Sequence, residues 1–282
     1  MSTQVAFLGP NGTYAEEAAI YLAKLEKYND AKFIPCAGIR SVIDHIARKL
    51  CDVAVVPIEN SVEGGVTATL DSLWTNPELF IRRAVVMPIQ HSLIGDIAIK
   101  EISEVLSHPQ ALAQCSGWLQ QNLPKALQLP TNSTAEAVKM IRGSHFRAAI
   151  GPRIKTESNG LKEIAYPIND IAGNCTRFVL IEHDECEQEG DVSTIAFSLH
   201  SNSPGALLEA LSCISNLGLN MSRIESRPSK RELGEYVFFI DVELSKSKKE
   251  ITYKLLEDLS PLCENLVNFG VYPSTSIQTK ST

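Results

Sequence analysis

The chain has 282 residues, which is enough for two domains of roughly 150 residues each. Hydrophobic residues make up 44% and charged residues 21%, and both values exclude disordered, collagen-like and disulfide-scaffold proteins. The net charge of −7 comes without a basic stripe, so no nucleic acid is expected as a partner. No apolar run approaches the ~20 residues that cross a membrane, and the N-terminus does not resemble a secretion signal. We therefore expect a cytoplasmic protein with no membrane partner.

The cysteines and histidines show no metal-binding pattern. The seven cysteines are odd in number and never spaced as CxxC, and the six histidines form no HxH, HxxxH or HExxH pair. Buried thiols in a reducing compartment and the absence of a metal site are the predictions that follow.

Up to residue 183, short apolar runs alternate with helical patterns. Strands are predicted at 5–8, 53–57, 104–107, 127–130, 147–150 and 176–181, and helices from residue 13 and at 65–74, 109–121 and 133–142. This βα alternation is typical of an α/β domain with largely parallel strands, here residues 1–183. The acidic, aperiodic segment 184–191 is interpreted as a linker.

The order of elements changes after the linker. Residues 192–273 predict strands at 193–200, 219–227, 235–243 and 265–272, with helices at 204–217 and 248–263. The pattern βαββαβ is that of a ferredoxin-like sandwich. Ser203 is expected to cap the first of these helices, with Pro204 in its first turn and Gly218 just past its end. The tail 274–282 is expected to be frayed.

Three predicted helices of the first domain follow strands directly and begin with an S/T-x-x-E/Q capping box. The three boxes start at Thr13, Ser107 and Ser133. In an open α/β sheet such helix N-termini gather beside the carboxyl ends of the strands, where their free N–H groups favour anions. A small carboxylate or phosphate is therefore the expected ligand.

Two polar loops lie at strand ends in the same domain. Glu59, Asn60 and Ser61 follow a predicted buried strand, and Asn174 precedes the strand that begins near residue 176. Strand alternation predicts Thr176 and Phe178 on one face of that strand and Arg177 on the other.

Taken together, these segments resemble the prephenate dehydratase family. The motifs that carry the resemblance are residues 9–14, 57–61 with Glu63 and Gly64, 107–109, 176–178, 205–208 and 225–228. Ala15 departs from the family pattern, which commonly has Ser there. The resemblance implies two α/β lobes hinged around a cleft, of periplasmic-binding-protein type, followed by an ACT regulatory domain at 192–273. It also implies a monofunctional enzyme, because no long helical segment precedes the first strand.

The family converts prephenate to phenylpyruvate, a decarboxylating dehydration on the way to phenylalanine. The resemblance implies that Thr176 has the leading catalytic role, and no cofactor is expected. Because an alcohol is a weak acid, a second group is expected to share the proton transfer; Glu59 is the candidate and His108 the reserve. The expected substrate contacts are Thr13, Asn60, Ser61, Ser107, Ser133, Asn174, Arg177 and Phe178.

The resemblance further implies that phenylalanine binds the C-terminal domain as an effector. The residues expected at that site are Gly205, Ala206, Leu207, Leu208, Asn220, Glu225 and Ser226. ACT domains of the family commonly associate side by side, which implies a homodimer or homotetramer. A chain ending near Gly190 is expected to keep part of its activity and to lose the response to phenylalanine.

Two alternatives remain open from the sequence. An arogenate dehydratase would run the same elimination on the transaminated substrate, and motif spacing does not separate a keto from an amino side chain. A non-catalytic protein that senses amino acids could use the same two-lobed architecture.

Overall fold

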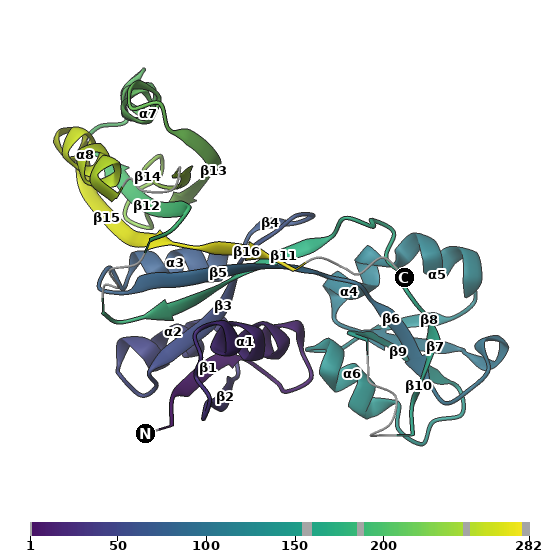
Figure 1. Cartoon of the computed structure of the whole chain (residues 1–282). Coiled ribbons are helices and arrows are strands. Elements are labelled where there is room, and N and C mark those ends of the chain that lie inside the picture. Colours follow the sequence, from purple (N-terminus) through teal and green to yellow (C-terminus); the bar gives the residue numbers. More distant parts are fainter. Residues whose placement is uncertain (1, 154–159, 185–188, 245–248, 278–282) are drawn as a thin grey trace.

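The computed structural model describes residues 2–153, 160–184, 189–244 and 249–277. Two lobes and a C-terminal domain make up the chain, with the first lobe between the other two (Figure 1). Part of the predicted linker 184–191 lies outside the described residues, as does the end of the predicted tail. Within the described residues, no helix is both long and apolar enough to span a membrane.

Lobe 1 is a mixed seven-stranded sheet with helices on both faces. Its strand order is β16-β5-β11-β3-β1-β2, with β4 paired to β3. The strands are β1 (Gln4–Leu8), β2 (Lys32–Cys36), β3 (Val53–Asn60), β4 (Gly64–Gly65), β5 (Phe80–Pro88), β11 (Cys175–Glu182) and β16 (Ser274–Ser276). One face packs against α1 (Tyr14–Leu25), and the other against α2 (Ile39–Ala47) and α3 (Thr67–Trp74).

Lobe 2 is a smaller five-stranded sheet in the order β10-β6-β9-β7-β8. Its strands are β6 (Ser92–Gly95), β7 (Glu104–Ser107), β8 (Leu127–Pro130), β9 (Arg147–Gly151) and β10 (Lys162–Ala165). Its helices are η1 (Ile99–Glu101), α4 (Pro109–Gln114), α5 (Ser116–Asn122) and α6 (Thr134–Met140). The predicted helix 109–121 is therefore two helices, separated at Cys115.

The expectation of largely parallel strands is wrong. The chain leaves lobe 1 after β5 and returns to it as β11, which runs antiparallel to both β3 and β5. In lobe 2, β6 is antiparallel to its neighbours β9 and β10. The two crossings between lobes therefore produce mixed sheets, while the predicted two-lobed architecture is confirmed.

The C-terminal domain has the predicted βαββαβ order. It consists of β12 (Val192–Leu199), α7 (Ala206–Asn216), β13 (Asn220–Pro228), β14 (Tyr236–Glu243), α8 (Lys249–Leu259), η2 (Ser260–Leu262) and β15 (Cys263–Tyr272). The sheet order β13-β14-β12-β15 is that of a ferredoxin-like sandwich. The cap of α7 is Gly205 rather than Ser203, and Gly205 adopts a left-handed φ of 91°. Gly218 lies just past the end of α7, as predicted.

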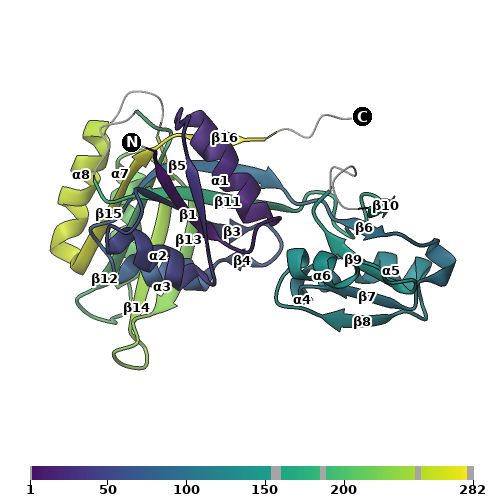
Figure 2. The ribbon, with the colours of Figure 1, turned by 90° about the horizontal axis from the view of Figure 1, so that it is seen from below.

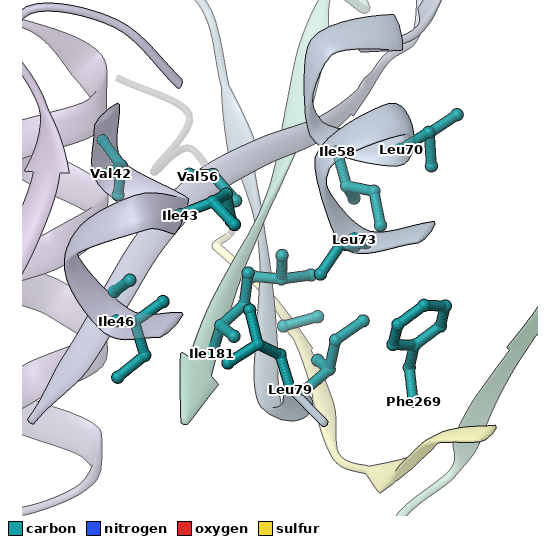
Figure 3. Close-up of a cluster of buried hydrophobic side chains, with 14 of the residues drawn as sticks. Val42, Ile43, Ile46, Val56, Ile58, Leu70, Leu73, Leu79, Ile181 and Phe269 are labelled. Carbon is teal, nitrogen blue, oxygen red and sulfur yellow. The ribbon is translucent and has the colours of Figure 1, made fainter. Parts of the chain in front are cut away.

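The C-terminal domain shares its core with lobe 1. Phe269 of β15 lies in the same buried cluster as Leu73 and Leu79 of lobe 1, which Figure 3 shows side by side. Tyr272 and Phe239 belong to that cluster and are fully buried. A chain ending near Gly190 would lack all three aromatic side chains and expose their lobe 1 partners.

Residues 274–276 are not frayed, contrary to the sequence prediction. They form β16, which pairs in parallel with β5 at the edge of the lobe 1 sheet (Figure 2). The chain that leaves the C-terminal domain is thus tied back into the first lobe.

The described cysteines are all free thiols, as expected. Four of them are buried, and Cys175 and Cys213 are partly exposed. Cys186 lies outside the described residues.

The shared core predicts a large stability effect from a residue of the C-terminal domain. Phe269→Ala should lower the free energy of unfolding by about 3–5 kcal/mol, because it leaves a cavity between two domains. Urea unfolding followed by circular dichroism measures the change. Leu233→Ala is the matched control, since Leu233 is fully exposed and its truncation should change stability by less than about 0.5 kcal/mol. Equal effects of both substitutions would contradict a shared core.

Candidate active site

A cleft of about 560 Å³ lies between the two lobes. The described residues that line it include the N-terminal ends of five helices, α1, α2 and α3 of lobe 1 and α4 and α6 of lobe 2. No lysine or arginine is among those lining residues. A bound anion would therefore be held by backbone N–H groups and hydroxyls rather than by a cationic side chain.

Two of the three predicted capping boxes are present at this cleft. Thr13 accepts a hydrogen bond from the N–H of Glu16, and Ser133 accepts one from the N–H of Glu136. Each glutamate carboxylate in turn accepts from the N–H of the residue before the cap. Both Thr13 and Ser133 line the cleft, as predicted.

The capping role predicted for Ser107 is wrong. Its side chain is fully buried and donates a 2.7 Å hydrogen bond to the carbonyl of Ile150, so it ties β7 to β9. The next residue, His108, caps α4 instead, with Nδ1 accepting from the N–H of Gln110 at 3.3 Å. His108 lines the cleft, whereas Ser107 is not among the described residues that do.

Strand β11 presents its residues as the alternation predicts. Thr176 and Phe178 line the cleft, and Arg177 points to the opposite face, where it pairs with Glu59 and with Asp241 of the C-terminal domain. The expected contact between Arg177 and the substrate is therefore wrong. The guanidinium belongs to the interface between lobe 1 and the C-terminal domain.

Glu59 also lies on the far face, which corrects its prediction as a catalytic acid. The pairing of β3 with β11 shifts register between Arg177, opposite Glu59, and Phe178, opposite Pro57. This β-bulge places an extra residue on β3, so that Pro57 and Asn60 both reach the cleft while Glu59 turns away from it. Without the bulge, alternation would have put Glu59 on the same face as Pro57.

Asn60 is the centre of the polar network around Thr176. Its side chain is buried, and its Nδ2 donates to the Thr176 hydroxyl at 2.9 Å, to Asn174 at 3.0 Å and to the carbonyl of Cys175 at 3.1 Å. Its Oδ1 accepts from the N–H groups of Val62 and Glu63. Among the described contacts the Thr176 hydroxyl only accepts, so its proton is free to be donated into the cleft.

Asn174 and Ser61 stabilise the network around Thr176 without lining the cleft themselves. Asn174 is buried and donates to Gln114 at 2.8 Å. Ser61 accepts from the N–H of Cys175 at 2.9 Å and donates to the carbonyl of Gly173. Both residues thus hold the start of β11 in place, and neither is among the described residues that line the cleft.

Two residues that the sequence did not indicate, His91 and Gln114, extend the network across the lobes. Gln114 of α4 contacts His91 at 3.0 Å and donates to Glu63, and His91 lies 3.3 Å from the hydroxyl of Tyr14. All four side chains line the cleft. Only Tyr14 and Glu63 belonged to a recognisable motif; His91 and Gln114 stand in unremarkable sequence, and topology alone brings them here.

The cleft contains little ionisable charge. Burial lowers the pKa of His91, which keeps its ring neutral, and burial raises the pKa of Tyr14 well above its usual range. Glu63 is the one carboxylate among the described lining residues. Within the described residues, no group of three or more His, Cys, Asp or Glu side chains could hold a metal ion.

The residues predicted to bind an effector do not all lie on one side of the C-terminal domain. Gly205 caps α7 and Leu207 belongs to it, on the helical face of the sheet, and Leu208 on the same helix is 70% exposed. Asn220 is exposed and donates to Glu243 at 2.8 Å. Glu225 faces the other way, and its carboxylate lies so close to Gly65 of lobe 1 that a side chain at that glycine would collide with it.

Within one chain Glu225 therefore does not face the start of α7, and its expected contact with the ammonium group of a bound amino acid stays a prediction. A register shift in β13 between Met221 and Arg223 puts Glu225 on the face that covers lobe 1. The neighbouring Ser226 is exposed on the opposite face, and Ala206 opens α7.

Neutral His91 predicts a pH dependence of stability. Since burial lowers its pKa in the folded state, the unfolded chain binds more protons as the pH falls through about 6.5, and stability declines there. His91→Gln should remove this part of the decline, measured as the free energy of unfolding between pH 5 and pH 8. His145→Gln is the control, because it makes the same replacement at an exposed histidine. A wild-type profile in His91→Gln would contradict the prediction.

Comparison with known proteins places the whole chain in one family. The model of the prephenate dehydratase family matches residues 5–186. Prephenate dehydratase of Methanocaldococcus jannaschii is 37% identical over 281 residues, covering 96% of this chain and 100% of that protein. The crystal structure of prephenate dehydratase from Arthrobacter aurescens in complex with L-Phe is 35% identical, with a TM-score of 0.86 over 96% of this chain and 90% of that one.

The same fold also carries another named activity. A solved structure of a protein described as a novel type of quorum-quenching acylase is 25% identical, with a TM-score of 0.80 over 96% of this chain and 98% of that one. The family model and the relatives that are more than 30% identical nevertheless agree with one another. The chain belongs to the prephenate dehydratase family.

Proposed function

We propose that this protein is a prephenate dehydratase, a carbon–oxygen lyase that makes phenylpyruvate from prephenate in phenylalanine biosynthesis. The observation that carries the proposal is the Thr176 hydroxyl, which faces the cleft with its oxygen held by Asn60 and its proton free. The free thiols of the described cysteines support a cytoplasmic location for this reaction.

The reaction breaks two bonds of the substrate together. The electron pair of the bond to the ring carboxylate moves into the ring as carbon dioxide leaves, and the ring hydroxyl departs with its own pair and takes up a proton to become water. The ring becomes aromatic, so the enzyme chiefly has to orient the substrate and stabilise the leaving oxygen. A hydrogen bond from Thr176 to that oxygen is suited to the task.

The two carboxylates of prephenate suit the helix N-termini of the cleft. Thr13 caps α1 on lobe 1, and Ser133 caps α6 on lobe 2. The free N–H groups in the first turn of each helix carry partial positive charge toward the cleft, one helix from each lobe. Holding one carboxylate from each lobe would close the lobes over the substrate and exclude water. The lining residues thus bind a dianion without a fixed cation.

His108 is the candidate for the second proton donor, since Glu59 lies on the far face. Its Nδ1 accepts from the backbone at α4, which leaves Nε2 to carry a proton in the cleft. The elimination transfers no hydride, and in this proposal the chain's own residues carry the mechanism without a cofactor.

Three other activities are distinguished by parallel assays. Arogenate offers an ammonium group that could pair with Glu63, so both substrates should be tested on the same preparation. An acylase would hydrolyse N-acyl substrates, and a sensing protein would bind without turnover. Phenylpyruvate formation from prephenate at the highest kcat/KM is the expected result.

The first test of the mechanism replaces the catalytic hydroxyl. Thr176→Ala should lower kcat by about 10²-fold or more with little change in KM, because it removes a donor to the leaving oxygen. Phenylpyruvate is followed by absorbance at alkaline pH. Thr176→Ser keeps a hydroxyl and should retain most of the activity. A folded Thr176→Ala protein with near-normal kcat would remove Thr176 from the mechanism.

We also propose that phenylalanine binds the C-terminal domain, an ACT domain, and inhibits the enzyme. The left-handed Gly205 at the start of α7 leaves backbone N–H groups open to a carboxylate. Leu208 of α7, Ile224 of the edge strand β13 and Tyr236 of the neighbouring β14 are 70%, 42% and 45% exposed. Pairing of two such edges in a homodimer, or twice in a homotetramer, would cover these apolar side chains.

This assignment predicts coupled loss of assembly and of phenylalanine binding. Ile224→Glu should shift the protein toward monomers in sedimentation velocity and weaken phenylalanine binding by about tenfold or more in calorimetry, because it buries a charge in the interface. Tyr253→Glu is the control, since Tyr253 is also exposed, at 57%, but lies on α8. Failure of the wild-type protein to bind phenylalanine at millimolar concentration would refute the effector site.

A further inference from the structure

Strand β11 connects the cleft to the C-terminal domain through two consecutive residues. Thr176 faces the cleft, and Arg177 faces the sheet of the C-terminal domain. The two residues are consecutive in the chain. A contact that holds the Arg177 side chain in place therefore also restrains the backbone that carries the Thr176 hydroxyl.

Arg177 is held by a carboxylate that belongs to the other domain. Its Nη2 donates to Asp241 of β14 at 2.5 Å and to Glu59 at 2.8 Å. The side chain of Asp241 is fully buried, whereas that of Glu59 is 37% exposed. Because a buried ion pair is screened far less than an exposed one, Asp241 is the stronger of the two partners.

Asp241 is itself fixed by further contacts within the C-terminal domain. It accepts from Arg223 through Nε at 2.8 Å and Nη2 at 3.2 Å, and from the Thr194 hydroxyl at 2.7 Å. Thr194 in turn lies 2.6 Å from the hydroxyl of Tyr272. Burial alone would raise the pKa of Asp241, but the charges of Arg223 and Arg177 outweigh it and hold the pKa low.

The geometry around Thr176 depends on the placement of β11. The Thr176 hydroxyl receives the 2.9 Å hydrogen bond from Asn60 only where β11 pairs across the β3 bulge. A strand that shifted away from the C-terminal domain would weaken that bond and move the hydroxyl relative to a substrate held by the helix N-termini. Displacements of about 1 Å can cost an enzyme 10²-fold in rate.

We propose that Asp241, a residue of the C-terminal domain, is a positioning residue for the reaction: through Arg177 it holds the strand that carries Thr176 at the cleft. This inference rests on the proposed dehydratase function. It assigns part of the active-site geometry to a domain that does not touch the substrate.

The test compares two substitutions at the same domain interface. Asp241→Asn keeps the shape and removes the charge that holds Arg177, and should lower kcat about tenfold while KM changes less than about twofold. Asp71→Asn is the matched control. Asp71 of α3 pairs with Arg227 and Lys230 of the C-terminal domain, and its described ion pairs do not reach β11, so its loss should leave kcat unchanged.

A second readout does not depend on turnover. Hydrogen–deuterium exchange of the peptide 175–182 should be faster in Asp241→Asn and unchanged in Asp71→Asn. If wild-type protein fails to convert prephenate, the proposed function is wrong, and the exchange comparison still decides whether Asp241 fixes β11. Unchanged kcat in folded Asp241→Asn, or the same losses in both variants, would overturn the positioning role.

A milder variant covers the case in which Asp241→Asn does not fold. Thr194→Val removes one hydrogen bond to Asp241 and keeps the side-chain shape. It should lower kcat about threefold and speed exchange of 175–182, because Asp241 then has one hydrogen bond fewer to hold it and only part of that loss acts on β11. Wild-type kcat and exchange in Thr194→Val would then reject the proposal.

Discussion

A carboxylate with no access to water determines how the parts of this molecule fit together. Asp241 can remain ionised inside the protein only because two guanidinium groups and a hydroxyl reach it, and one of those guanidinium groups comes from lobe 1. Removing either domain would break the ion pair between Arg177 and Asp241, leaving Asp241 with Arg223 as its one guanidinium partner or Arg177 with Glu59 as its one described carboxylate partner. The buried hydrophobic cluster shared by lobe 1 and the C-terminal domain also depends on both parts, because either part alone would expose its apolar side chains to water.

The bulge in β3 separates two kinds of chemistry across a single sheet. The bulge brings Asn60 to the cleft beside Thr176 of β11, and it turns Glu59 to the far face, where it pairs with the guanidinium of Arg177. In the proposed mechanism oriented dipoles bind the carboxylates of the substrate, and these dipoles are already in place before the substrate arrives.

The sequence correctly predicted the helices and strands in which apolar residues recur at a regular spacing. It also predicted which face of a strand a residue occupies where the strand alternates without a bulge. The βαββαβ order of residues 192–273 and the opposite faces of Thr176 and Arg177 are examples. It misassigned Glu59 because a β-bulge leaves no local mark in composition, and Ser107 because His108 competes with it as a cap. His91 and Gln114 reach the cleft through long-range topology, which no spacing rule encodes.

The return of β16 to the lobe 1 sheet has a consequence for a chain emerging from the ribosome. Ser274 pairs with Ala84, so one edge of β5 has no partner strand until nearly the whole described chain has been made. An open strand edge invites pairing with neighbouring nascent chains. Because β16 follows β15 directly, the strands and helices of the C-terminal domain are synthesised before β16. The sheet of lobe 1 contains the first strand to be made and is the last sheet to be completed.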